Sequence, residues 1–300
     1  MYEWNQAIQK AIYWIEDNLE KNPSLLEMSK AIGYSPYYCS TKFHEIVGMT
    51  IKSYIAGRRL AKSAFAIRDT NERILDIAIK YGYSSQEALT RAFMTAFGCT
   101  PAVYRKRPCP VALQMPKAVL YPHQYNQLYQ GGITMSKTCL TEPHICVEYI
   151  PAHKYIGIWE DKAHHYGEFW NYHDCDKVCG IIESMRNVSD KIVGPHMAGF
   201  FYVNGEIRYF YGLGVPADYT GEVPEGFEIK EFPTSYYLKF VHPTFDYFKD
   251  NDEVMGKVDN LAWNFDPKTM GFEWNDDCQI YHRHYPEVLG YEFLRPVKKL

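Results

Sequence analysis

The chain has 300 residues, of which 46% are hydrophobic and 16% aromatic, and its formal net charge is −4. This composition is typical of a globular protein, and the length suits two domains better than one. The sequence contains no run of about eighteen apolar residues, and its start lacks the basic-then-apolar pattern of a secretion signal. We therefore expect a cytoplasmic protein that has no membrane partner.

The charge is divided unequally along the chain. Residues 1–107 carry 15 Lys and Arg against 10 Asp and Glu, whereas residues 108–300 carry 17 against 26. A basic first part followed by an acidic second part is typical of a nucleic-acid-binding domain joined to a domain of another kind. The eight cysteines are scattered and form no Cys-x-x-Cys pair, which favours reduced thiols in a cytoplasm.

Residues 1–107 are predicted to be helical throughout. A first apolar stripe recurs at three- and four-residue spacing from Trp4 to Leu19. Ser24 with Glu27 forms a capping box at the start of the next helix, and Gly33 ends that helix as a left-handed residue. Ser35 then caps a third helix, which spans residues 36–47. Two short helices joined by a tight glycine turn predict a helix-turn-helix unit.

The same pattern returns 49 residues later, because Gly33-Tyr34-Ser35 is repeated as Gly82-Tyr83-Ser84. We predict Asn71 or Thr70 as the cap of the second unit's first helix, and Ser84 with Glu87 as the capping box of its second. A helix over residues 51–67 joins the two units, which can then enter successive major grooves. An ordinary helical bundle is the alternative interpretation. The predicted inward stripes, one in each unit, are Cys39, Phe43 and Val47, and Leu89, Phe93 and Phe97.

Residues 16–107 resemble the DNA-binding domain of AraC-type transcriptional regulators, in the MarA and right-origin-binding-protein branch. Residues 77–93 (IAIKYGYSSQEALTRAF) and 97–105 (FGCTPAVYR) carry the resemblance. It implies that the chain binds double-stranded DNA and works with RNA polymerase. It further implies that the exposed faces of two recognition helices read bases, through Tyr37, Ser40 and Thr41 in the first and Gln86, Glu87, Thr90 and Arg91 in the second.

Some of these assignments have an alternative. Glu87 could accept from cytosine or serve only in its capping box. Arg91 suits guanine or a phosphate, and Gln86 suits adenine. The basic residues outside the recognition helices are either phosphate contacts or solvated surface charges; they are Arg58, Arg59, Lys62, Arg105 and Lys106.

The second part of the chain follows a predicted linker, residues 108–142, and is predicted to be an α+β domain over residues 143–300. It holds an internal repeat, since the strands around Pro151 and Pro233 are each followed by a helical stretch and two paired strands. Asn204-Gly205 is a strong hairpin signal. The repeat predicts a pseudo-twofold domain with a cleft between its halves, and two unrelated α+β units are the alternative.

This second part resembles the GyrI-like effector-binding domain. The residues that carry the resemblance are 150–152 (IPA), 209–215 (YFYGLGV) and 291–297 (YEFLRPV). The resemblance implies a pocket of aromatic side chains around a buried acid, which binds amphipathic compounds with organic cations among the candidates. Glu292 is our candidate acid, although Gln279 stands where relatives often have a second Glu. The candidate aromatic residues are Trp159, Trp170, Tyr202, Tyr209, Trp263, Trp274 and Tyr281.

Other kinds of site have less support. His164, His165, His173, Cys175 and Cys179 crowd one segment, but their spacing matches no zinc motif, so we expect neither a metal nor a cofactor. We predict an all-α double helix-turn-helix domain followed by an effector-binding domain, in a ligand-controlled transcription regulator without catalytic residues. The alternatives are a hydrolase of the GyrI-like type, with Glu292 as general base beside Tyr281 and Trp274, and a second part that binds protein or is merely structural.

Overall fold

The structure is a computed structural model that describes residues 2–21, 23–117, 119, 142–285 and 290–300. The chain forms two compact units. Unit 1 comprises Met1–Tyr129 together with Cys175–Ser184, and unit 2 comprises Gln130–Asp174 and Met185–Leu300. Most of the predicted linker, residues 120–141 with residue 118, lies outside the described residues.

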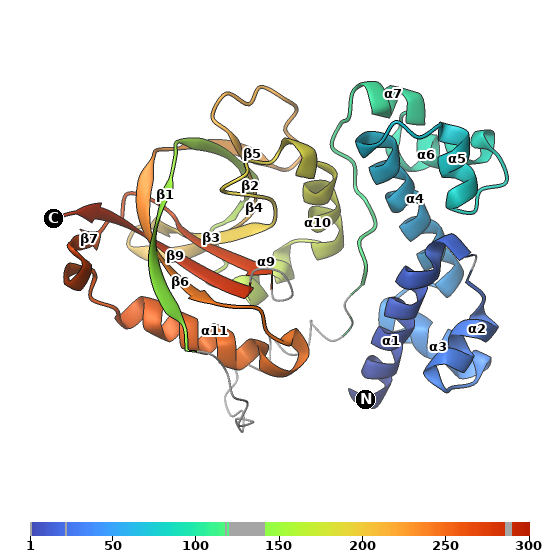
Figure 1. Ribbon diagram of the computed structural model, residues 1–300, viewed down its shortest axis with the longest axis horizontal. Helices are drawn as coiled ribbons and strands as arrows, with labels where there is room; N and C mark the ends of the chain where they lie inside the picture. The colour runs from blue at the N-terminus through green and yellow to red at the C-terminus, as the bar shows by residue number, and fades with distance from the viewer. Residues whose placement is uncertain (1, 22, 118, 120–141, 286–289) are drawn as a thin grey trace. The chain divides into compact units, whose positions relative to one another are not determined.

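The helices of unit 1 follow the predicted order (Figure 1). The third and sixth helices are the second helices of the two helix-turn-helix units, and the fourth helix joins the units. The helices are α1 (Tyr2–Asn18), α2 (Leu25–Ile32), α3 (Pro36–Val47), α4 (Ile51–Asp69), α5 (Ile74–Lys80), α6 (Gln86–Phe97) and α7 (Pro101–Lys106), with a 3-10 turn η1 at Leu19–Lys21.

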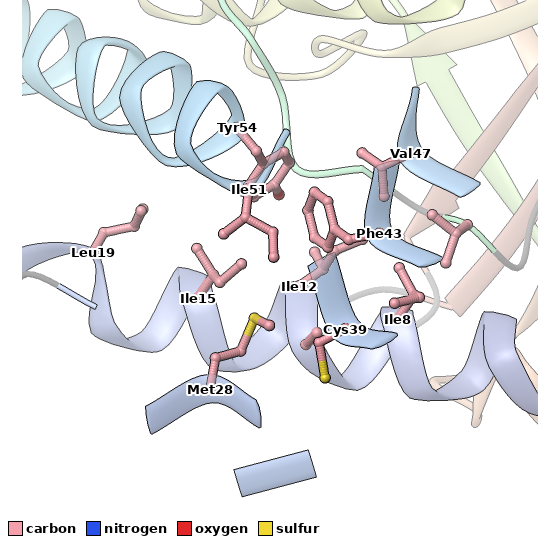
Figure 2. Packing of buried hydrophobic residues seen from close by; sticks show 12 residues of the cluster. Ile8, Ile12, Ile15, Leu19, Met28, Cys39, Phe43, Val47, Ile51 and Tyr54 are labelled. Atoms are coloured by element: carbon pink, nitrogen blue, oxygen red, sulfur yellow. The ribbon is translucent and has the colours of Figure 1, made fainter. Parts of the chain in front are cut away.

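Each helix-turn-helix unit has its own apolar core. In the first, the stripe of α1 meets Met28 of α2 and the inward side chains of α3 (Figure 2). Cys39 and Phe43 are fully buried and Val47 nearly so, as the sequence predicts. In the second, Leu89 and Phe93 are fully buried. Residues of α4 contribute to both cores, so each recognition helix packs on a core of its own.

The helix caps confirm the sequence analysis in the first unit and correct it in the second. Ser24 and Glu27 form the predicted capping box, and Gly33 has φ 80°. In the second unit, α6 is capped by Ser85, whose side chain accepts from the backbone N–H of Ala88, so the prediction of Ser84 is wrong by one residue. The prediction of Asn71 or Thr70 as a cap is also wrong, because α5 starts without a side-chain cap.

A helix from the second part of the chain, α10 (Cys175–Ser184), belongs to unit 1. Arg68 of α4 donates to the carbonyl of Ser184 at its last turn (2.6 Å), and the backbone N–H of Val111 donates to the Ser184 hydroxyl (3.0 Å). Gly180 touches the backbone of Leu113 so closely that a Cβ atom there would lie 1.9 Å from the Leu113 carbonyl oxygen. The start of the predicted linker is therefore packed against helices.

Unit 2 is built on a nine-stranded antiparallel sheet (Figure 1). Its strands are β1 (His144–Ile150), β2 (His153–Glu160), β3 (Met197–Val203), β4 (Glu206–Pro216), β5 (Glu228–Phe232), β6 (Ser235–His242), β7 (Phe272–Trp274), β8 (Ile280–Tyr285) and β9 (Gly290–Lys299). The helical stretch predicted after β2 is broken into α9 (Tyr166–Tyr172) and α10, and the one after β6 is α11 (Tyr247–Asn264).

The strand order reads β1-β6-β9-β8-β3-β4-β2-β5, with β7 added beside β9. The counterparts in the two repeats are β1 and β5, β2 and β6, β3 and β8, and β4 and β9. When the order is read from the other end, each strand is replaced by its counterpart. The halves meet where β3 pairs with β8, and the first strand of each repeat pairs with the other repeat, as β1 with β6 and β5 with β2. A pseudo-twofold arrangement of two related halves is therefore built into the sheet.

The hairpin between β3 and β4 turns at Asn204 and Gly205, with φ 52° and 82°. Left-handed values at both positions match the two-residue turn that the Asn-Gly pair favours. Because side chains alternate along a strand, the sheet has two faces. Helix α11 runs along one side of the sheet (Figure 1), and the face that packs on it, here called the outer face, carries Leu238, Phe240 and Phe293. The opposite, inner face carries the cluster of Tyr155, Phe210, Phe232, Tyr237, Tyr281 and Leu294.

Candidate nucleic-acid interface and candidate ligand site

The first recognition helix, α3, presents its outer side to solvent because Cys39, Phe43 and Val47 fix the other side in the core. Tyr37 is 75% exposed. Ser40 is exposed and Thr41 is half-buried. The three predicted base-reading residues of α3 thus reach the surface, and a tyrosine ring is the largest group among them.

The second recognition helix, α6, is arranged in the same way. Gln86, Glu87 and Arg91 are exposed and Thr90 is half-buried. The carboxylate of Glu87 interacts with the hydroxyl of Ser85, the residue that caps α6, and this hydrogen bond holds the pKa of Glu87 below its ordinary value. Glu87 therefore takes part in capping. Gln86, Thr90 and Arg91 remain the stronger candidates for base contacts.

The structure corrects the prediction for three basic residues. Arg58 is buried, and its guanidinium pairs with Glu16 of α1 through N–O distances of 2.8 and 2.9 Å. Arg59 donates to the carbonyl of Leu19, and Arg105 donates to those of Ile67 and Glu72. These side chains join helices within unit 1. Lys62 and Lys106 are exposed.

A hollow of about 460 Å³ lies between the start of α2, α3 and α4. Ser40 of the first recognition helix lines it together with Lys52 and Arg59, and no acidic side chain is among its lining residues. Lys52 is a basic residue that the sequence analysis missed, although Arg58, Arg59 and Lys62 of the same helix were named as candidate phosphate contacts. The hollow adds positive charge beside α3.

In unit 2, Glu292 is buried within a closed group of four charges, here called the charged quartet: Glu148, Lys239, Arg283 and Glu292. Arg283 contacts Glu148 at 2.9 Å and Glu292 at 3.0 Å, and Lys239 contacts the same two carboxylates at 2.7 and 3.2 Å. Although burial opposes ionisation, the two cations hold the pKa of Glu148 below its ordinary value. Both carboxylates are thus already compensated.

Three of the predicted ligand residues share the inner face of the sheet. Glu292 and Leu294 alternate with the outer-face residues of β9, and Tyr281 faces Leu294 across the β8–β9 pair. Trp159 packs against the same inner cluster. Tyr281 is fully buried, and its hydroxyl lies 2.8 Å from the Nε2 atom of His153. The inner face therefore carries a cluster of buried rings near the junction between the halves, where a cleft was predicted.

The other five predicted aromatic residues face elsewhere. Trp170 and Tyr209 pack with Tyr211 and Phe169 where α9 covers β4. Tyr202 belongs to the outer-face core. The ring centroids of Trp263 and Trp274 lie 4.7 and 3.7 Å from the Arg295 guanidinium carbon. The single pocket that the sequence analysis assembled around one acid therefore does not include these five rings, which pack with helices or with Arg295 instead.

Two further observations concern other kinds of site. Within residues 2–21, 23–117, 119, 142–285 and 290–300, no three or more His, Cys, Asp or Glu side chains form a group that could hold a metal ion. Over the same ranges, no helix combines the length and apolar character needed to cross a membrane.

Two helix-turn-helix units with exposed recognition helices define a DNA-binding protein of the double helix-turn-helix class. Residues 28–107 match the family described as "Helix-turn-helix domain". The chain is 39% identical to the transposon Tn10 TetD protein of Escherichia coli over 33% of this chain and 72% of that protein. It is 38% identical to the multiple antibiotic resistance protein MarA of Salmonella typhimurium over 33% of this chain and 78% of that protein. The chain belongs to the AraC-type family of helix-turn-helix transcriptional regulators.

A longer match joins the chain to the right origin-binding protein of Escherichia coli strain K12, with 35% identity over 45% of this chain and 50% of that protein. The chain thus spans about half the length of this relative. A crystal structure of an AraC-type regulator from Chromobacterium violaceum covers 36% of this chain at 20% identity, with a TM-score of 0.33.

Proposed function

We propose that the chain is a transcription regulator in which unit 1 reads an operator and unit 2 senses a small amphipathic compound. The observation that carries the first part is the pair of supported recognition helices with Tyr37 and Arg91 exposed. RNA polymerase is the expected protein partner of such a regulator, and the cytoplasm is its expected location.

The base contacts are proposed for Tyr37, Ser40 and Thr41 of α3 and for Gln86, Thr90 and Arg91 of α6. Arg91→Ala should weaken binding to a selected operator by about 1–3 kcal/mol and relax the sequence preference at one base pair. Arg73→Ala is a matched control, because Arg73 is also exposed but lies outside the recognition helices and pairs with Asp76. A binding-site selection that returns the same preference for Arg91→Ala and the native chain would remove Arg91 from base reading.

For unit 2 we propose a GyrI-like effector domain, whose ligand contacts the inner face beside Trp159 and the charged quartet, whereas the fully buried Tyr281 supports that face from within. The pseudo-twofold strand order of the sheet and the aromatic cluster on its inner face support this assignment. Because the quartet holds two acids and two bases, an organic cation would have to compete with Arg283 and Lys239 for Glu292. The arrangement therefore favours an uncharged amphipathic ligand over a cation.

The ligand proposal is tested with a cationic and a neutral fluorescent dye of similar size. Glu292→Gln leaves the inner face with one excess positive charge, so it should weaken the cationic dye more than the neutral one. Glu148→Gln is the matched control, since Glu148 contacts the same two cations. Equal effects of the two substitutions would assign the change to charge balance, and equal loss of both dyes would exclude Glu292 from ligand recognition.

The hydrolase alternative has less support from the geometry. Glu292 as a general base would need an accessible carboxylate, whereas its two oxygens contact Lys239 and Arg283. Trp274, the proposed neighbour, lies on β7 against Arg295. Product formation from a candidate ligand that is abolished by Glu292→Gln would favour the hydrolase.

A further inference from the structure

The first turns of α10 carry two thiols on one side of the helix. Cys175 and Cys179 are separated by one helical turn, and their sulfur atoms lie 3.7 Å apart. Cys175 is exposed and Cys179 is half-buried, so reagents in solution can reach the pair. Cys39 and Cys278, by contrast, are buried in the two units.

The helix restricts what this pair of thiols can do. Residues four apart on a helix have Cβ atoms about 5–6 Å apart, whereas a disulfide needs a Cβ separation of about 3.5–4.5 Å. A disulfide between Cys175 and Cys179 would therefore require the start of α10 to unwind. An atom that binds both sulfurs adds its own two bonds between them, so it can connect the pair while the helix stays intact.

We propose that Cys175 and Cys179 form a dithiol site for trivalent arsenic compounds. Thiol sulfur is a soft ligand and prefers soft, thiol-seeking elements to the hard cations that oxygen ligands bind. With phenylarsine oxide, both sulfurs form bonds to arsenic, and the oxide oxygen leaves as water with the two thiol protons. The oxidation states of arsenic and sulfur do not change, so the step needs no oxidant or reductant.

The helix that carries the two thiols is held within unit 1 near both of its ends. Lys117 contacts Asp176, next to Cys175, and Arg68 donates to the carbonyl of Ser184 at the other end. Val178 and Ile182 are buried. A helix fixed in this way presents the two sulfurs in one geometry, which reduces the entropic cost of binding both at once.

The experiment adds phenylarsine oxide to the full reduced chain and counts adducts by native mass spectrometry. We expect one adduct, formed with loss of one water, that survives excess 2-mercaptoethanol and is removed by 2,3-dimercaptopropanol. Cys175→Ser and Cys179→Ser should each abolish the resistant adduct, because one thiol cannot form the chelate. Far-UV circular dichroism should keep its helical signal in the adduct.

A second close pair of cysteines supplies the control. Cys99 and Cys109 lie near one another at the edge of the second helix-turn-helix core. Cys109→Ser should leave the resistant adduct in place. Loss of the adduct in Cys109→Ser, or its persistence in both Cys175→Ser and Cys179→Ser, would overturn the proposal. Neither result bears on operator binding or on the ligand of unit 2, so this proposal and the proposed function fail independently.

Discussion

Replacing Asp259 by Asn should stabilise unit 2 at neutral pH and not at acidic pH. Asp259 lies on α11 and accepts a hydrogen bond from the hydroxyl of Tyr291 (2.8 Å), which in turn lies 2.6 Å from the Nδ1 atom of His282. Burial raises the pKa of Asp259 to about 7, although the bond from Tyr291 opposes this. The folded protein therefore keeps a proton on Asp259 that the unfolded chain loses near pH 4.

The magnitude follows from proton linkage. Where only the folded state holds the proton, each rise of one pH unit lowers the free energy of unfolding by about 1.4 kcal/mol. Because Asp259 is half ionised in the folded chain at pH 7, the loss is about 2 kcal/mol between pH 5 and pH 7 and about 3 kcal/mol between pH 5 and pH 8. The amide that replaces the carboxyl group would carry no such proton and could still accept from Tyr291. The stability difference between Asp259→Asn and the native chain should therefore grow by about 3 kcal/mol from pH 5 to pH 8.

Two histidines on β8 act in the opposite direction and make the comparison with the variant necessary. Burial lowers the pKa of His282 to about 3 and that of His284 to about 4. The unfolded chain binds protons at both histidines below pH 6.5 and the folded chain does not, so their contribution to stability rises with pH up to 6.5. Because this contribution is common to the native chain and the variant, it cancels in their difference.

The assay is urea unfolding at pH 5 and pH 8, followed by tryptophan fluorescence, to which Trp263 contributes from its place on Phe293 where α11 meets β9. Asp218→Asn, at an exposed carboxylate, is the control and should change stability equally at both pH values. A difference between Asp259→Asn and the native chain that is the same at pH 5 and pH 8 would refute the reasoning.

Three further predictions concern unit 1 and α10, each measured by thermal or chemical unfolding. Glu16→Gln leaves a buried arginine of α4 without its carboxylate and should cost about 3–5 kcal/mol, and a loss below about 1 kcal/mol would contradict this. Ser85→Ala should cost about 0.5–2 kcal/mol and Ser84→Ala far less, because only the first removes the cap of α6; equal effects would restore the prediction from sequence. Gly180→Ala should detach or distort α10, whereas Gly256→Ala, with open space around it on α11, should stabilise by about 0.5–1 kcal/mol.

The sequence predicted the helix-turn-helix units well because their signals are local. A serine cap, a glycine with positive φ and an inward stripe all act within one or two helical turns, and Ser24, Gly33 and Phe43 take the expected roles. Arg58 was mistaken for a surface charge because its partner Glu16 lies 42 residues away, so spacing along the chain carries no sign of the pair.

In the second part of the chain, contacts between residues that are distant in sequence could not be predicted. Its repeat and the Asn-Gly turn were visible, since each depends on short stretches. The exchange of β1 and β5 between the halves depends on pairing across the whole sheet. The same is true of the charged quartet, because Glu292 and Glu148 come from strands at distant positions in the sequence. A buried glutamate was predicted, but not the two cations that neutralise it.

The placement of α10 limits how the chain can be divided for experiment. A fragment that ends just after Leu113 keeps Val111 and Leu113 but loses Gly180 and the rest of α10, which packs on this stretch. The fragment would expose apolar side chains that the full chain covers, and Arg68 would lose the carbonyl groups it holds. Unit 1 is thus built from two separate stretches of the sequence. A fragment without α10 should be less stable and more prone to aggregation than the full chain.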